Sequence, residues 1–205
     1  ETPDALDCLE HGTHVAGIIA ALANGVDGTG VAPDAKIYNA RVFGDDVEKS
    51  GYDSTIMRAI LYLISEEDNS TREVNTEAPK VDIINLSLGG SGDTAGFQAV
   101  IDKAHEKGVA VFAATGNDGD QAMMYPASYE HVVAVSATDK NNERAYFANY
   151  GSITDLSAPG VNIWATYADE KGNSGYASLQ GTSMSCPVAA GQAAVILSGQ
   201  ADLPA

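Results

Sequence analysis

Basic residues are scarce in this sequence of 205 residues: 11 Lys and Arg stand against 28 Asp and Glu, for a formal net charge of −17. An acidic surface of this kind repels phosphate backbones and anionic membrane surfaces. We therefore expect neither nucleic acid nor a membrane among the partners. The composition does not distinguish adaptation to a saline habitat from the acidity of an ordinary secreted enzyme.

Long apolar runs and cysteines are also nearly absent. No stretch approaches the roughly 18 apolar residues that a membrane-spanning helix needs, and residues 1–7 show neither the basic nor the apolar region of a signal peptide. The two cysteines, Cys8 and Cys186, are too few for a disulfide framework and lack the paired spacing of a zinc site. We expect one soluble domain with two free or buried thiols, and any export signal to lie outside this sequence.

Apolar runs of strand length alternate with helical patterns along the chain. This alternation is typical of βαβ units, in which helices cover both faces of a parallel sheet. The predicted fold class is therefore α/β, with a mostly parallel, doubly wound sheet. Residues 65–79 contain almost no apolar side chain and are predicted to be an exposed acidic loop insertion. Strands are predicted at about residues 36–43, 81–86, 108–114, 131–136 and 160–165, and helices at about 12–22, 54–65, 94–106 and 183–198.

A serine follows small residues in Gly181-Thr182-Ser183-Met184 and opens a helical pattern of small apolar residues. A hydroxyl at a helix N-terminus lies beside backbone N–H groups and the positive end of the helix dipole, which favour the oxyanion formed in acyl transfer. The motif by itself is equally consistent with a serine that only caps its helix.

Two histidines lie three residues apart at the start of another helical pattern, His11-Gly12-Thr13-His14. A histidine that begins a helix is well placed to point its imidazole outward, which favours His11 as a chemical group. A zinc site made of the pair lacks a glutamate between them and an obvious third ligand. We therefore expect His14 to be packed rather than to bind a metal ion.

Asn117 follows the apolar strand pattern 108–114 in the motif Thr115-Gly116-Asn117. The carboxyl ends of parallel strands form the edge at which such sheets bind their ligands. A side-chain amide at this edge can donate a hydrogen bond to a developing oxyanion. In isolation, an asparagine that supports a Gly-rich turn is an equally good explanation.

Together the three motifs resemble those of the subtilisin family of serine proteases (subtilases), in the family's chain order. The resemblance implies a subtilisin-like fold over residues 1–205 and a secreted serine endopeptidase that acts on polypeptides through an acyl-enzyme. It assigns Ser183 as nucleophile, His11 as general base, and Asn117 with the Ser183 backbone N–H as oxyanion donors. A pro-segment inhibitor is a further partner that it implies. Other similar segments are Gly30-Val31-Ala32-Pro33, Asn85-Leu86-Ser87-Leu88-Gly89-Gly90, Tyr125-Pro126-Ala127 and Ser157-Ala158-Pro159-Gly160.

The family's catalytic aspartate has no counterpart here. In the family it ends a strand well before the histidine motif, whereas Asp4 and Asp7 lie only seven and four residues before His11. We expect the domain to be N-terminally truncated in this sequence, with the catalytic Asp outside the chain. A separate chain that supplies it, or a degenerate protease, are the alternatives. Two other functions remain possible from the residues: a non-catalytic subtilase-like module that binds peptides, and a metal-dependent hydrolase.

The resemblance also implies a substrate pocket and a structural calcium ion, with no cofactor for catalysis. The pocket is expected to accept a large apolar residue before the scissile bond. Residues 22–28 resemble the family's calcium loop, although a Gly-rich turn without an ion explains them equally well. The implied substrate-binding residues are Gly51, Ser87, Leu88, Gly89, Ala114, Asp118 at the rim and Met124 at the base. The implied metal ligands are the carbonyls of Leu22, Val26 and Gly28 and the side chain of Asn24.

Overall fold

The structure is a computed structural model, and it describes residues 10–43, 51–64, 80–122, 124–168 and 173–200. It confirms the predicted α/β class. Within the described residues, four strands form a parallel sheet in the order β1-β2-β3-β4. The inner strands, β2 and β3, are almost wholly buried because helices cover both faces. The strands are β1 (Ile83–Leu86), β2 (Ala110–Ala114), β3 (Val132–Thr138) and β4 (Leu156–Pro159).

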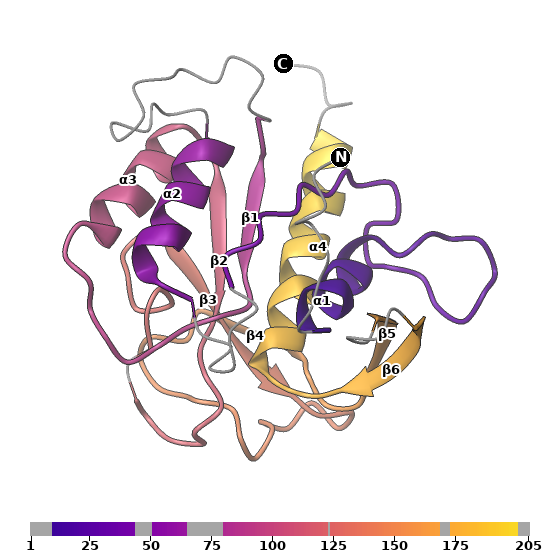
Figure 1. Ribbon diagram of the computed structural model, residues 1–205. Helices are drawn as coiled ribbons and strands as arrows, with labels where there is room; N and C mark the ends of the chain where they lie inside the picture. The colour runs from indigo at the N-terminus through magenta and orange to yellow at the C-terminus, as the bar shows by residue number, and fades with distance from the viewer. Residues whose placement is uncertain (1–9, 44–50, 65–79, 123, 169–172, 201–205) are drawn as a thin grey trace.

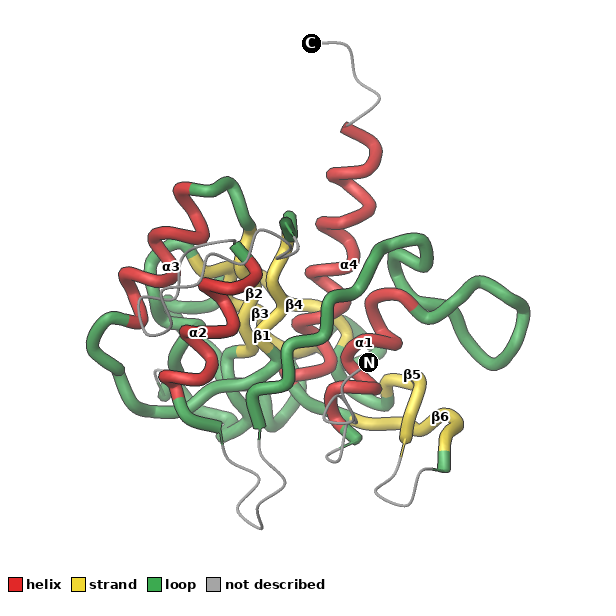
Figure 2. Tube along the Cα trace, turned by 45° about the horizontal axis from the view of Figure 1, so that its top comes forward, coloured by secondary structure: helices red, strands yellow, loops and turns green. Residues whose placement is uncertain are grey.

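Four helices lie on the two faces of this sheet (Figure 1, Figure 2). On one face are α2 (Asp53–Leu63) and α3 (Phe97–Glu106), and on the other are α4 (Thr182–Gln200) and α1 (His11–Ala20), which packs against α4. Apolar residues at helical spacing make the buried stripe of α2, as the sequence predicted. In the described segments, no helix combines the length and the apolar character needed to cross a membrane.

Packing of α1 on α4 fixes the histidine motif relative to the serine motif. Ile18 of α1 and Met184 of α4 are buried in one apolar cluster with Ala165. Ala165 belongs to a separate antiparallel hairpin, β5 (Ile163–Ala168) and β6 (Ser174–Leu179), which lies beside α1. A cluster of this kind holds its elements closely because protein interiors are packed nearly without voids.

The predicted elements differ from the structure at the ends of the sheet. The strand predicted at 160–165 exists as β5, but it pairs antiparallel with β6 and does not join the parallel sheet. Neither β4 nor β6 was predicted, because β4 is short and mostly exposed and β6 is rich in small polar residues. The loop insertion predicted at 65–79 lies outside the described residues, as does Cys8.

The prediction of a strand at 36–43 is wrong. This segment forms only an isolated bridge between Phe43 and Gly51, and Ile37 and Tyr38 are 44% and 50% exposed. A strand needs a neighbour to accept and donate its backbone hydrogen bonds. The segment lies across a cavity from β1, which is the edge strand of the described sheet, and so finds no partner there.

Candidate active site

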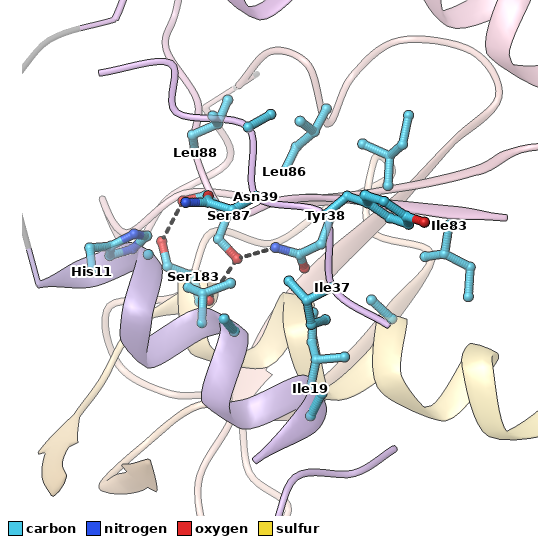
Figure 3. Close-up of a pocket in the computed structure, with 18 of the residues that line it drawn as sticks. His11, Ile19, Ile37, Tyr38, Asn39, Ile83, Leu86, Ser87, Leu88 and Ser183 are labelled. Carbon is cyan, nitrogen blue, oxygen red and sulfur yellow. Dashed lines mark hydrogen bonds between the residues drawn. The ribbon is translucent and has the colours of Figure 1, made fainter. Parts of the chain in front are cut away.

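Three residues singled out from the sequence, His11, Asn117 and Ser183, line one cavity of about 2180 Å³. His11 begins α1, Ser183 lies in the first turn of α4, and Asn117 follows the carboxyl end of β2. Figure 3 shows the His11 ring and the Ser183 side chain pointing toward one another at one end of this cavity. The structure therefore places the three residues around one cavity, and their chemical roles stay predictions.

Ser183 is tied to the carboxyl end of β1 through both its backbone and its side chain (Figure 3). Its carbonyl would normally accept the helical hydrogen bond of residue 187, but Pro187 has no N–H. The Ser87 hydroxyl donates to this carbonyl instead, at 2.8 Å, and is itself an acceptor for Asn85 Nδ2 at 3.0 Å. In return the Ser183 hydroxyl donates to the Ser87 carbonyl at 3.2 Å. The helix start that carries the hydroxyl is thereby held against the sheet.

Cys186 lies one turn after Ser183 and is fully buried. Burial raises the pKa of the Cys186 thiol to about 12, against the smaller opposing effect of hydrogen bonds with the Ser87 side chain and the Leu86 backbone. A thiol must ionise to act as a nucleophile. Near neutral pH Cys186 is therefore an inert core residue, whereas Ser183 is only partly buried and faces the cavity.

The second histidine of the motif, His14, is fully buried in the structure. Its Nε2 lies 3.2 Å from the carbonyl of Ile163 and 3.1 Å from that of Ala177, so it donates to the β5–β6 hairpin. Burial lowers the pKa of His14, which favours the neutral ring. The ring thus secures α1 to the hairpin, and its burial agrees with the prediction that His14 is packed.

The side chain of Asn117 is oriented by the start of α4. The backbone N–H and the hydroxyl of Thr182 both donate to Asn117 Oδ1, at 2.9 Å and 3.0 Å. An N–H can only donate, so the oxygen of the amide must face Thr182. The NH₂ end of the amide is then directed away from Thr182. Asn117 is exposed on the wall of the cavity, where this NH₂ group is accessible to a ligand.

Comparison with known proteins settles which family has this arrangement. The sequence profile of the subtilase family (Peptidase S8) matches residues 1–205. The chain belongs to the subtilase family. It is 41% identical to Subtilisin BL of Lederbergia lenta over 194 residues, which cover 95% of this chain and 65% of that protein. It is 40% identical to Subtilisin E of Bacillus subtilis (strain 168) over 202 residues, which cover 97% of this chain and 48% of that protein.

A solved structure has the same fold over most of the chain. Its title is "Proteases from Pseudoalteromonas arctica PAMC 21717". The two structures superpose with a TM-score of 0.84 and share 36% sequence identity, and the match covers 94% of this chain and 60% of that chain. The chain thus spans about half to two thirds of the length of these subtilases.

Most of the substrate-binding residues that the subtilase resemblance implies meet around the same cavity. Gly89 lies so close to the next wall that an added Cβ would be 3.0 Å from the carbonyl oxygen of Tyr125. Gly51 is not among the cavity-lining residues and pairs with Phe43, so its contact with substrate stays a prediction. The predicted residues that line the cavity are Ser87, Leu88, Gly89, Ala114, Asp118 and Met124.

The predicted calcium loop of this subtilase presents oxygen atoms in a strongly bent backbone. Positive φ angles of 78° at Gly25 and 53° at Asp27 bend residues 22–28 twice. Asn24 Oδ1 accepts the Val26 N–H at 3.0 Å, and the Leu22 carbonyl accepts the Asn24 N–H at 2.9 Å. Each of these oxygens keeps a second lone pair. Carbonyl and amide oxygens are ligands of Ca²⁺ in proteins, so the donor set fits this ion.

The roles of two hydrogen-bonding residues of the site, the partly buried Asn85 and the fully buried Asn149, were not predicted from the sequence. Asn85 orients the Ser87 hydroxyl, and Asn149 contacts the loop that carries Asn117. Asn85 is the second-last residue of β1, where a polar residue in an apolar strand is a usable signal. Asn149 lies in a loop rich in polar residues, and nothing in its local sequence distinguishes it.

Proposed function

We propose that this chain is the main part of a serine endopeptidase that hydrolyses polypeptides through an acyl-enzyme. The observation that carries the proposal is that the side chains of His11 and Ser183 point toward one another at one end of the cavity. The Ser183 oxygen attacks the peptide carbonyl carbon while His11 takes its proton, and His11 then gives that proton to the leaving amine as the C–N bond breaks. Water, activated in the same way, hydrolyses the ester to free Ser183.

The negative charge of the tetrahedral intermediate is stabilised by two donors. One is the NH₂ group of Asn117, which the bonds from Thr182 to Oδ1 leave facing the cavity. The other is the backbone N–H of Ser183, at the positive end of the dipole of α4. Donors that are already oriented before the reaction stabilise the transition state far more than water molecules do, because they need not reorganise as the charge develops.

We infer that the carboxylate that orients His11 lies on a strand outside residues 1–205. The cavity extends from Ser183 between the outer edge of β1 and the segment 36–43, over an apolar floor formed by α1 and α4. A strand in this space would pair with β1 and would also give 36–43 the partner that a strand there requires. This accounts for the strand-like sequence of 36–43 and for its irregular backbone here. Its carboxyl end would lie near His11.

A fluorophosphonate that reacts only with activated serines tests this function against a non-catalytic peptide-binding module. In the protein that includes the inferred strand, we expect labelling at Ser183 and its loss in Ser183→Ala. Ser185→Ala is the matched control, because Ser185 lies on the same helix but is fully buried, and it should label like the unmodified protein. A folded protein that binds peptides but takes no label would establish the binding module instead.

The shape of the pocket predicts cleavage after large apolar residues. Met124 lines the cavity and narrows it beside Gly116, where an added Cβ would lie 2.8 Å from Met124 Cγ. Methionine is flexible and shortens the pocket without closing it, so Leu, Met, Phe and Tyr should all be accepted. Met124→Gly should raise kcat/KM for Phe relative to Leu by about 10-fold, the effect of a few methylene-sized contacts. A peptide library measures this, and strict selection for Asp, Glu or Gly would contradict it.

Calcium is expected to stabilise the fold through the loop 22–28, with no part in the chemistry. At about 100 times its dissociation constant it should raise the melting temperature by about 5–10 °C, from the mass-action gain of a folded-state ligand. Asn24→Ala removes one ligand and should abolish most of this shift, which differential scanning calorimetry measures with and without chelator. Equal melting temperatures in calcium and in chelator would refute the site. Secretion and inhibition by a pro-segment stay predictions of the family resemblance.

A further inference from the structure

Asn149 is a fully buried polar residue in the loop between β3 and β4, and its side chain holds the turn that follows β2. Its Oδ1 accepts the backbone N–H of Asp118 at 2.8 Å and that of Gly119 at 3.0 Å. Its Nδ2 donates to the carboxylate of Asp118 at 3.3 Å. One side chain therefore fixes both the backbone and the side chain of the residues directly after Asn117.

The backbone of Asn149 anchors the same turn from the other side. Its N–H donates to the carbonyl of Gly116 at 3.1 Å, and its carbonyl accepts the hydroxyl of Ser136 on β3 at 2.7 Å. Gly116 has φ of 103°, and an added Cβ would lie 2.6 Å from Asn149 Nδ2. Only glycine allows this conformation and this close approach. Asn149 thus links the turn to the rigid sheet.

Asn117 lies in the chain between the residues that Asn149 holds, with Gly116 before it and Asp118 and Gly119 after it. On its other side, Thr182 holds Asn117 Oδ1 and also accepts the Gly116 N–H at 3.2 Å. The two anchors hold the backbone before and after Asn117 and the plane of its amide. Without the Asn149 side chain, the N–H groups of Asp118 and Gly119 would lose their acceptor, and Asn117 would be held by Thr182 and by backbone hydrogen bonds of the turn alone.

We propose that Asn149 is a positioning residue for the oxyanion donor: it touches no substrate, and it holds the turn so that Asn117 Nδ2 points at the developing oxyanion. This inference rests on the proposed function, because it requires that Asn117 stabilises an oxyanion. Hydrogen bonds to a transition state depend steeply on geometry, and a displacement of about 1 Å costs about 100-fold in rate. Loss of Asn149 should therefore lower kcat and leave substrate binding nearly unchanged.

A double-mutant cycle in the protein that includes the inferred strand tests the proposal. We expect Asn149→Ala to lower kcat by about 10- to 100-fold with KM changed by less than about twofold. In an Asn117→Ala background, the same substitution should lower kcat by less than about twofold further, since the donor that Asn149 positions is already gone. Equal losses of kcat in both backgrounds would show that Asn149 acts through general stability and would overturn the positioning role.

The cycle also separates this inference from the function on which it rests. If Asn117→Ala alone leaves kcat unchanged, the oxyanion role of Asn117 is wrong and the positioning role falls with it. If Asn117→Ala lowers kcat by about 10²- to 10³-fold, as the loss of this donor does in subtilisin, and Asn149→Ala leaves kcat unchanged, only the positioning role is wrong.

Exchange of the side chains of Asn149 and Asp118 provides a second test, in which neither side chain is shortened. Asn149→Asp keeps an acceptor for the two backbone N–H groups but places a second carboxylate beside Asp118, so kcat should fall. Combining it with Asp118→Asn restores a donor and an acceptor in exchanged positions, so the loss of kcat caused by Asn149→Asp should shrink to less than about threefold when Asp118→Asn alone is the reference, as expected for coupled neighbours. Failure of the combined variant to recover activity while its melting temperature recovers would overturn the proposal.

Discussion

Ser183→Ala should lower kcat for peptide hydrolysis by about 10⁶-fold, the size of the loss that subtilisin shows for this replacement. His11→Ala should cost about as much, and the double variant should be no slower than either single variant. The reason is that a nucleophile and its base act as one unit: Ser183 without His11 stays protonated, and His11 without Ser183 has no proton to accept. The remaining activity comes from substrate binding and the oxyanion donors.

Steady-state kinetics on a fluorogenic peptide in the protein that includes the inferred strand measures this prediction. KM should change little, because the Ser183 hydroxyl contributes mainly to the transition state. Cys186→Ser is a matched control, since the thiol is buried and its pKa of about 12 keeps it out of the reaction. Losses that multiply in the double variant would show that the two residues do not act together and would contradict the proposed mechanism.

Residues 1–205 without the inferred strand should hydrolyse peptides about 10⁴-fold more slowly than the protein that includes it. This is the size of the loss in subtilisin when the aspartate alone is removed. The carboxylate fixes the tautomer and the orientation of the imidazole and stabilises the imidazolium that forms in the transition state. We expect such a strand to occupy the cavity that extends from Ser183 between β1 and the segment 36–43.

Adding the missing strand back as a peptide tests this second prediction. A peptide with the sequence of the inferred strand, added to residues 1–205, should restore much of kcat, whereas the same peptide with its Asp changed to Asn should bind and restore little. Circular dichroism and protection of the β1 amides from hydrogen exchange would report binding separately from activity. Equal activation by the two peptides would mean that the strand acts by completing the sheet, and that its carboxylate is not the partner of His11.

Local chemistry let the sequence predict the parts of the site that depend on helix starts and strand ends. His11 and Ser183 each open a helix of small residues, and Asn117 follows an apolar strand, so their positions follow from neighbouring residues. The parallel sheet at β1, β2 and β3 was predicted for the same reason, since buried parallel strands read as continuous apolar runs. Each of these features depends on neighbouring residues in the sequence and not on which distant segment packs against them.

The tertiary structure decided everything that depends on a partner far away in the chain. Segment 36–43 has a strand-like sequence but forms no strand, because backbone hydrogen bonds require a neighbour that is not beside it here. Ser87 replaces the hydrogen bond that Pro187 cannot donate, and Asn149 holds the turn of Asn117 from 30 residues away along the chain. The sequence by itself thus determined which groups are the candidates for chemistry. Only the tertiary structure decided which groups hold them, because such contacts have no local pattern.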